Sequence, residues 1–377
     1  MATSPNGIVQ YQDVDLALPG EGLLLDSGKQ FGPITVRYER YGEVNRDGSN
    51  VILVLHAFSG DAHAAGLHSP GDSHPGWWEE MIGPGRALDT NRYCVICTNV
   101  LGGCQGTTGP GSTNPETGEP YALTFPIITI RDMTNVQRLL LEQLGIERLY
   151  AVIGGSMGGM NALDWAVAYP EQVERAIVLA STARSGAQSI AFNAVGRNAI
   201  MSDPRWNEGR YYGGETPSRG LAIARMVGHI TYLSNESMGM KFGRRLQERD
   251  GFGFTFTDQF AVESYLEYQG DKFVDRFDAN SYIYLTKAMD YFDLSERYGS
   301  LDEAFGRTRA RFLILSYSSD WLFPTAQSKE VVYALMKNGK DVSFSEISSP
   351  YGHDSFLLET RRQEKLILSF LEGAHGI

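Results

Sequence analysis

The stretch Gly154-Gly155-Ser156-Met157-Gly158-Gly159 decides how the rest of the chain is interpreted. It follows the apolar run Leu149-Tyr150-Ala151-Val152-Ile153, which is typical of a buried strand, and precedes residues 160–169, which favour a helix. A serine between strand and helix with small neighbours is typical of a nucleophile elbow, a tight turn that lifts the hydroxyl clear of the backbone. The alternative is a glycine-rich helix start capped by a serine. The flanking pattern favours Ser156 as a nucleophile.

Outward from this stretch, strand and helix patterns alternate. Residues 34–41, after a short apolar run at 22–26, alternate apolar and polar side chains, which predicts antiparallel strands at a sheet edge. Helices are expected at 131–144 and 331–336. Strands are expected at 51–55, 92–100, 149–153, 175–180, 311–316 and 342–347, and those at 51–55, 92–100 and 311–316 are expected to be buried. This order predicts a mostly parallel sheet with helices on both faces.

The alternation stops between residues 186 and 300. Helical patterns occur there at 219–233, 261–268 and 282–290, with no convincing buried strand. We therefore expect a helical lid at 186–300, inserted over the catalytic edge of a core made of residues 1–185 and 301–377.

Two residues complete a catalytic pattern with Ser156. Asp320 follows the strand expected at 311–316, and His353 follows the last strand. The order serine, aspartate, histidine is that of the α/β-hydrolase fold and of neither serine-protease fold. His353 is predicted to act as general base and Asp320 to orient it. The alternative makes Asp320 a helix N-terminal acid and His353 a turn residue.

Other residues fit around this triad. The backbone N–H groups of Met157 and of Phe58, in the loop after residues 51–55, are predicted to form the oxyanion hole. Arg225 and Tyr232 lie seven residues apart, so they share one helix face with His229 between them. An Arg–Tyr pair can bind a carboxylate, and packing at a lid seam is the equally weighted alternative. Asp354 is a second carboxylate that can receive a substrate cation.

Composition excludes several kinds of binding partner. The net charge of −12 argues against nucleic-acid or anionic-membrane partners, and no apolar run is long enough to span a membrane. The start of the chain lacks a signal-peptide pattern, so a cytoplasmic protein is expected.

Short cysteine and histidine motifs do not indicate a metal or redox site. Cys94 and Cys97 lie three apart on an expected strand and so face opposite sides, as core cysteines. His56, His63, His68 and His74 match no zinc spacing, so no metal is expected, and His56 and His63 are predicted to brace their loop. No P-loop motif occurs.

Four segments together resemble the homoserine O-acetyltransferase family. They are His56-Ala57-Phe58-Ser59-Gly60-Asp61-Ala62-His63, Gly154-Gly155-Ser156-Met157-Gly158-Gly159-Met160, Ser319-Asp320-Trp321-Leu322-Phe323-Pro324 and Pro350-Tyr351-Gly352-His353-Asp354-Ser355-Phe356. The lid segment Tyr265-Leu266-Glu267-Tyr268-Gln269-Gly270-Asp271-Lys272-Phe273 is also similar, and the resemblance runs from about residue 30 to residue 370.

The resemblance implies an α/β-hydrolase-fold enzyme of methionine biosynthesis. Such an enzyme transfers the acetyl group of acetyl-CoA, a co-substrate, to L-homoserine by a ping-pong route through acetyl-Ser156, without a cofactor. It also implies that Arg225 binds the carboxylate and Asp354 the ammonium of homoserine, and that the protein is a homodimer formed through the lid. Phe58 and Ser59 stand where many members have Leu and Thr, which can alter the acyl pocket.

Three alternatives remain open at this stage. The first is a sister enzyme that uses succinyl-CoA as donor or L-serine as acceptor. The second is a carboxylic ester hydrolase, which would use water as acceptor and would not need the Arg225 and Asp354 pair. The third is a non-catalytic binding protein on the same fold, which the intact triad pattern disfavours.

Overall fold

The main sheet organises the molecule in the computed structural model, which describes residues 3–20, 22–247, 251–257 and 260–373. Its strand order is β1-β4-β6-β5-β7-β8-β9-β10. All neighbours from β6 to β10 are parallel, whereas β4 pairs antiparallel with both β1 and β6. The strands are β1 (Gln12–Asp15), β4 (Thr35–Tyr41), β5 (Val51–Leu55), β6 (Cys94–Thr98), β7 (Ala151–Gly155), β8 (Arg175–Leu179), β9 (Arg311–Tyr317) and β10 (Val342–Ile347). The mostly parallel sheet expected from the sequence is confirmed.

Helices cover both faces of this sheet. Side chains of α1 (Ile130–Gln143), α2 (Met157–Ala168) and α10 (Thr325–Lys337) share one core cluster, whereas those of α12 (Thr360–Glu372) belong to the other. The second face is also covered by an irregular segment that contains Trp78, Met81 and Ile82. Central strands β5 to β8 are buried along their whole length, which is why their sequences are apolar at consecutive positions.

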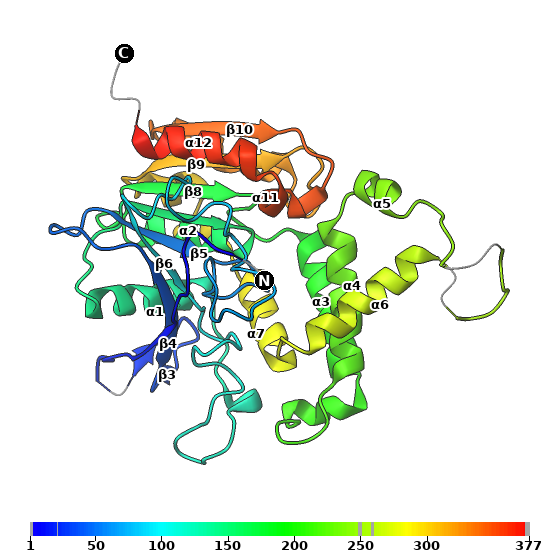
Figure 1. Ribbon diagram of the computed structural model, residues 1–377. Helices are drawn as coiled ribbons and strands as arrows, with labels where there is room; N and C mark the ends of the chain where they lie inside the picture. The colour runs from blue at the N-terminus through cyan, green and yellow to red at the C-terminus, as the bar shows by residue number, and fades with distance from the viewer. Residues whose placement is uncertain (1–2, 21, 248–250, 258–259, 374–377) are drawn as a thin grey trace.

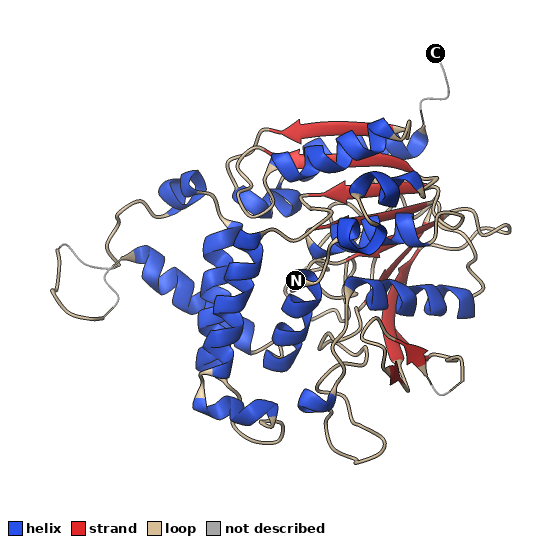
Figure 2. Cartoon of the chain, turned by 180° about the vertical axis from the view of Figure 1, so that it is seen from behind, coloured by secondary structure: helices blue, strands red, loops and turns tan. Residues whose placement is uncertain are grey.

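The lid is a separate group of helices at one side of the sheet, beyond the carboxyl ends of β7 and β8 (Figures 1 and 2). Its helices are α3 (Ala187–Met201), α4 (Ser218–Tyr232), α5 (Asn235–Lys241), α6 (Ala261–Val274) and α7 (Ala279–Asp290). Helix α4 packs against both α3 and α6. The short helices α8 (Leu294–Tyr298) and α9 (Leu301–Gly306) then lead back to β9, and α9 packs against α10. Helix α11 (Ser355–Leu358) precedes α12.

One sequence expectation about strands was wrong, and one helix of the lid was not identified. The run at residues 22–26 forms only β2 (Leu23–Leu24), which pairs with β3 (Gln30–Phe31) in a separate two-stranded sheet, and the main sheet ends instead at β1. Helix α3 was not expected, because its buried residues Ser189, Gly196, Arg197 and Ile200 form no apolar stripe.

The cysteines behave as core residues. Cys94 and Cys97 are buried in the two different core clusters, on opposite faces of β6, as their spacing predicts. Burial raises the pKa of the Cys94 thiol to about 11, which keeps it protonated and unreactive. In the described residues, no helix has the length and apolar character that crossing a membrane requires.

Candidate active site

The elbow holds Ser156 in a strained conformation between β7 and α2. Its φ is +58° and its ψ is −124°, a backbone conformation that residues other than glycine seldom adopt. The turn directs the side chain toward the cavity under the lid, and only 7% of the residue is exposed. Ser156 is therefore set apart from the regular backbone of the strand and helix that carry it.

The glycines around Ser156 are required by contacts with neighbouring backbone. A Cβ on Gly158 would lie 2.0 Å from the carbonyl oxygen of Leu55, and one on Gly154 would lie 2.3 Å from that of Gly158. A Cβ on Gly159 would lie 2.5 Å from the Cβ of Ser181. The small residues expected around the elbow thus allow α2 to begin directly against β5.

Replacing Gly158 with alanine is expected to destabilise the protein. The new methyl group would overlap the backbone at Leu55, and overpacking of this kind costs about 1–3 kcal/mol. The free energy of unfolding in urea measures the effect. Gly239→Ala in α5 is a matched control, because its Cβ would have open space and alanine favours a helix interior. A Gly158→Ala protein as stable as the wild type would contradict the contact.

The three predicted catalytic side chains lie within hydrogen-bond distance of one another. His353 Nε2 is 2.9 Å from Ser156 Oγ, and His353 Nδ1 is 2.8 Å from Asp320 Oδ2. Asp320 also accepts hydrogen bonds from the backbone N–H groups of Leu322 and Phe323, at 3.0 and 2.9 Å. These donors fix the orientation of the buried carboxyl group, so that its other oxygen points at the imidazole. The arrangement is that of a serine nucleophile with a base and an orienting acid.

His353 lies in a short turn directly below the lid. The turn, residues Gly352–Asp354, follows β10, and a Cβ on Gly352 would lie 2.5 Å from the backbone nitrogen of Ser234. The end of α4 is hydrogen-bonded to both catalytic loops, since Trp321 Nε1 donates to Leu233 O at 3.0 Å and Ser234 Oγ donates to Pro350 O. The lid therefore packs tightly on the loops that carry the acid and the base.

The charges around His353 predict a pH profile. Burial alone lowers the pKa of His353, but the charge and hydrogen bond of Asp320 and the charge of Asp354 outweigh burial and raise it. A base must be deprotonated, so acylation of Ser156 by p-nitrophenyl acetate should rise with pH around a midpoint above the usual 6.5. Asp354→Asn removes one of these charges and should lower the midpoint. Stopped-flow release of p-nitrophenol from about pH 5 to about pH 9 measures both. A midpoint that rises in Asp354→Asn would contradict this account.

Two backbone N–H groups have no partner among the described residues and are candidates to bind an oxyanion. Neither the Phe58 nor the Met157 N–H has a hydrogen-bond acceptor within the part of the chain that the structure describes. Met157 is the first residue of α2, where backbone N–H groups have no helical partner and the helix dipole favours negative charge. The positions fit the predicted oxyanion hole.

The loop after β5 is braced by its histidines, as predicted. His56 Nε2 accepts from Val100 N at 3.2 Å, and its Nδ1 lies 2.8 Å from Ala57 O. His63 Nδ1 is 3.0 Å from Glu39, a buried residue of β4 whose other carboxylate oxygen is 2.7 Å from His68 Nε2. Donor atoms of Glu39, His63 and His68 are close enough to hold a metal ion. Spacing along the chain could not reveal this cluster, because Glu39 comes from another strand.

The predicted substrate residues line one cavity with Ser156 and His353. Arg225, Tyr232 and Asp354 surround a space of about 560 Å³ that is also lined by Ser156 and His353. The guanidinium carbon of Arg225 is 5.5 Å from the centre of the Tyr232 ring, so the two share the helix face expected from their spacing. Burial raises the pKa of Asp354, whereas the charges of His353 and Arg225 oppose that increase. The cavity thus presents groups of both signs close to the nucleophile.

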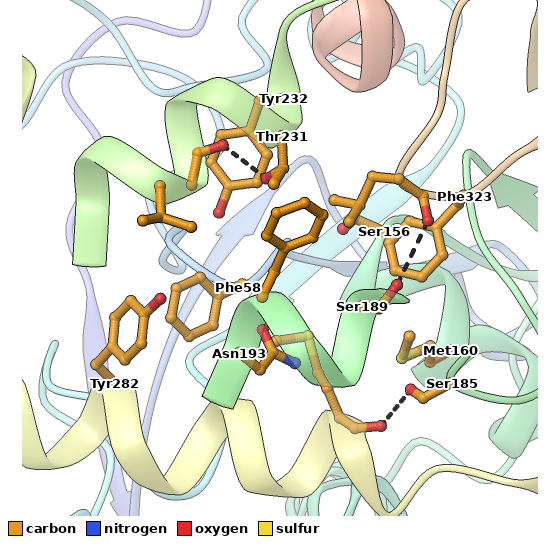
Figure 3. A pocket seen from close by; sticks show the side chains of 15 residues that line it. Phe58, Ser156, Met160, Ser185, Ser189, Asn193, Thr231, Tyr232, Tyr282 and Phe323 are labelled. Atoms are coloured by element: carbon orange, nitrogen blue, oxygen red, sulfur yellow. Dashed lines mark hydrogen bonds between the residues drawn. The ribbon is translucent and has the colours of Figure 1, made fainter. Parts of the chain in front are cut away.

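A second, smaller pocket of about 50 Å³ also borders Ser156 (Figure 3), and it shares Phe58 and Tyr232 with the larger cavity. It is lined by Phe58 and Met160 from the core and by lid residues such as Asn193 and Tyr282, and its described lining contains no charged side chain. The Phe58 ring borders both spaces and packs edge-on against the Tyr282 ring, with 5.0 Å between the two ring centres.

Arg276 belongs to the larger cavity and was not found from the sequence. It lies in the turn after α6, outside the helical patterns that drew attention to Arg225. Only its proximity to the loop after β5 in the folded chain reveals it, through a 2.9 Å hydrogen bond from its Nη1 to Ser59 O.

Strand order, elbow and triad define an alpha/beta hydrolase fold. The family model described in those words matches residues 50–360.

Known proteins narrow the class further. The homoserine O-acetyltransferase of Methanohalobium evestigatum is 57% identical over 355 residues, 94% of this chain and 72% of that protein. The crystal structure of homoserine O-acetyltransferase from Bacillus anthracis superposes with a TM-score of 0.91 at 34% identity, covering 97% of this chain and 98% of that one. Esterase E22 superposes with a TM-score of 0.88 at 33% identity, covering 97% of this chain and all of that one. This chain belongs to the homoserine O-acetyltransferase family.

Proposed function

We propose that this protein is a homoserine O-acetyltransferase, which moves the acetyl group of acetyl-CoA to the hydroxyl of L-homoserine. The observation that carries the proposal is one cavity that holds the Ser156–His353 pair together with Arg225 and Asp354. An amino acid carries one negative and one positive group, and this cavity offers a partner for each. Membership in the family supports the same reaction.

The proposed first half-reaction forms acetyl-Ser156. His353 takes the proton of Ser156 Oγ as the oxygen attacks the thioester carbon, and Asp320 stabilises the imidazolium. The N–H groups of Phe58 and Met157 bind the negative oxygen of the tetrahedral intermediate. The carbon–sulfur bond then breaks, His353 returns its proton to the sulfur, and CoA leaves.

The second half-reaction repeats these steps with homoserine. Arg225 and Tyr232 hold its carboxylate and Asp354 its ammonium, so its hydroxyl is directed at the acetyl carbon. His353 takes the hydroxyl proton and gives it to Ser156 Oγ as O-acetyl-L-homoserine leaves. This product places the reaction in methionine biosynthesis, and the use of a CoA thioester fits a cytoplasmic enzyme.

The small pocket supports acetyl as the transferred group. A space of about 50 Å³ without a charged side chain accommodates a methyl group, whereas a succinyl chain brings a carboxylate that would be left there without a cation. The Phe58 ring borders this space, so the residue that departs from the usual family sequence also helps to limit its size.

An ester hydrolase is the second candidate, and the likeness to esterase E22 favours it. Both activities pass through an acyl-serine and differ in the acceptor of the second half-reaction, so the acceptor has to be tested directly.

The deciding experiment measures thiol release from acetyl-CoA or succinyl-CoA, with L-homoserine, with L-serine and with neither. We expect release that needs acetyl-CoA and L-homoserine together, and mass spectrometry should detect O-acetyl-L-homoserine. Equally fast release without an acceptor would identify a hydrolase. A preference for succinyl-CoA or L-serine would identify a sister activity.

We further propose that the protein is a homodimer formed through the lid. Large apolar side chains lie exposed together at the lid tip, which we define as Phe252, Phe254 and Phe256. Exposed apolar clusters of this kind mark interaction sites. Light scattering coupled to size-exclusion chromatography should give twice the chain mass, and Phe254→Ser with Phe256→Ser should shift it toward the monomer.

A further inference from the structure

Two arginines of the lid converge on one residue beside the nucleophile. Arg225 Nη1 lies 3.4 Å from Ser59 Oγ, and Arg276 Nη1 donates to Ser59 O at 2.9 Å. Both arginines line the cavity that contains Ser156. Ser59 directly follows Phe58, so the two guanidinium groups lie at the loop that supplies one oxyanion N–H.

A single buried ring supports both guanidinium groups. The guanidinium carbon of Arg225 is 4.6 Å from the centre of the Phe273 ring, and that of Arg276 is 5.3 Å from it. Phe273 is 1% exposed and packs parallel to Phe277 at 4.7 Å. Cation–π contacts orient a guanidinium group without neutralising its charge. Phe273 therefore holds two full positive charges near each other.

Neither charge is neutralised by a neighbour. Among the described residues, no carboxylate lies within ion-pair distance of Arg225 or Arg276, and the buried Nε of Arg225 has no hydrogen-bond partner. Burial and the charge of Arg225 together lower the pKa of Arg276, although Asp61 opposes that shift. Two unpaired like charges are unfavourable in a chain whose net charge of −12 offers carboxylates in excess. Such a pair is stabilised when an anion binds between its members.

We propose that Arg276 is the second guanidinium of the carboxylate site, and that it binds the α-carboxylate of the acceptor together with Arg225. The inference rests on the proposed function, because it assigns a further residue to that acceptor. Two guanidinium groups can each donate to one carboxylate, which favours acceptors that carry this group over those that lack it.

The test compares two acceptors that differ only in the carboxylate. L-Homoserine and 3-amino-1-propanol share the hydroxyl and the ammonium. A hydrogen bond to a charged group contributes about 1.5–3 kcal/mol, so Arg276→Gln should lower kcat/KM for L-homoserine about 10- to 100-fold. The value for 3-amino-1-propanol should change by less than about threefold. Acylation by p-nitrophenyl acetate, which involves no amino acid, should keep its rate.

Lys272→Gln is the matched control. Lys272 lines the same cavity and its loss removes one positive charge, but among the described residues its ammonium makes no hydrogen bond to Ser59 and no cation–π contact with the Phe273 ring. Lys272→Gln should change kcat/KM for both acceptors by the same factor. If Arg276→Gln does so as well, or slows acylation, Arg276 only positions the loop and the proposal is wrong. A rise in KM for acetyl-CoA alone would assign Arg276 to the donor's phosphates and would also overturn it.

A conservative variant covers loss of folding. Arg276→Lys keeps the charge but not the planar fork, and it should reduce the preference for L-homoserine by a smaller factor. An unchanged preference in this variant would overturn the proposal. Failure of the proposed function looks different, because wild-type protein would then release no more CoA with L-homoserine than with water.

Discussion

Alanine at position 156 is expected to lower L-homoserine-dependent CoA release by about 10⁴-fold or more. The variant has no hydroxyl for the acetyl group, so neither half-reaction can use the acyl-enzyme route. Steady-state thiol release and the burst of p-nitrophenol both measure the loss. Mass spectrometry should detect an added acetyl group on wild-type protein and none on Ser156→Ala.

Ser328→Ala is the control for removal of a buried hydroxyl. Ser328 lies in α10, is 1% exposed, and its Oγ has no hydrogen-bond partner in the described part of the chain. This variant should keep its activity and melt close to the wild type. Transfer by Ser156→Ala at a rate close to that of the wild type would mean that homoserine attacks acetyl-CoA directly.

Asp320→Asn is expected to lower L-homoserine-dependent CoA release by about 10⁴-fold. The amide NH₂ would donate to His353 Nδ1, which now faces Asp320 Oδ2 at 2.8 Å. The ring proton would then lie on Nε2, the atom that has to accept the proton of Ser156. Stopped-flow acylation by p-nitrophenyl acetate measures the loss, and circular dichroism should show an intact fold.

The neighbouring carboxylate provides the comparison for Asp320. Asp354→Asn removes a negative charge near the same imidazole without altering the hydrogen bond to Nδ1. Its effect on acylation should be much smaller than that of Asp320→Asn, whereas its KM for L-homoserine should rise. Equal effects on acylation would show that charge near His353, and not the tautomer, controls the rate.

Features that depend on neighbouring residues could be predicted from the sequence. The elbow is local, because strand, turn and helix follow each other within about 20 residues. The side chains of Asp320 and His353 could be placed because each follows a strand of the sheet, β9 or β10, and parallel strands end at the same edge. Arg225 and Tyr232 share a helix face for the same kind of reason, the regular turn of α4.

Features that depend on contacts between distant segments could not be predicted. Arg276 approaches Ser59 across 217 positions of chain, and it lies in a turn without a repeating pattern. The approach of His63 and His68 to Glu39 depends on how the loop after β5 folds back on β4. Helix α3 could not be predicted, because most residues on its buried face are small or polar and form no apolar stripe.

The contact between the end of α4 and the catalytic loops has a consequence for how such enzymes diversify. Because Trp321 and Pro350 are hydrogen-bonded to the residues that follow Tyr232, the segment that we propose to bind the acceptor and the segments that hold the acid and base share one interface. A chimaera that receives a foreign lid without the matching loops would lose its reactivity along with its old specificity. New acceptors are therefore more accessible through single substitutions inside the cavity than through exchange of the lid as a module.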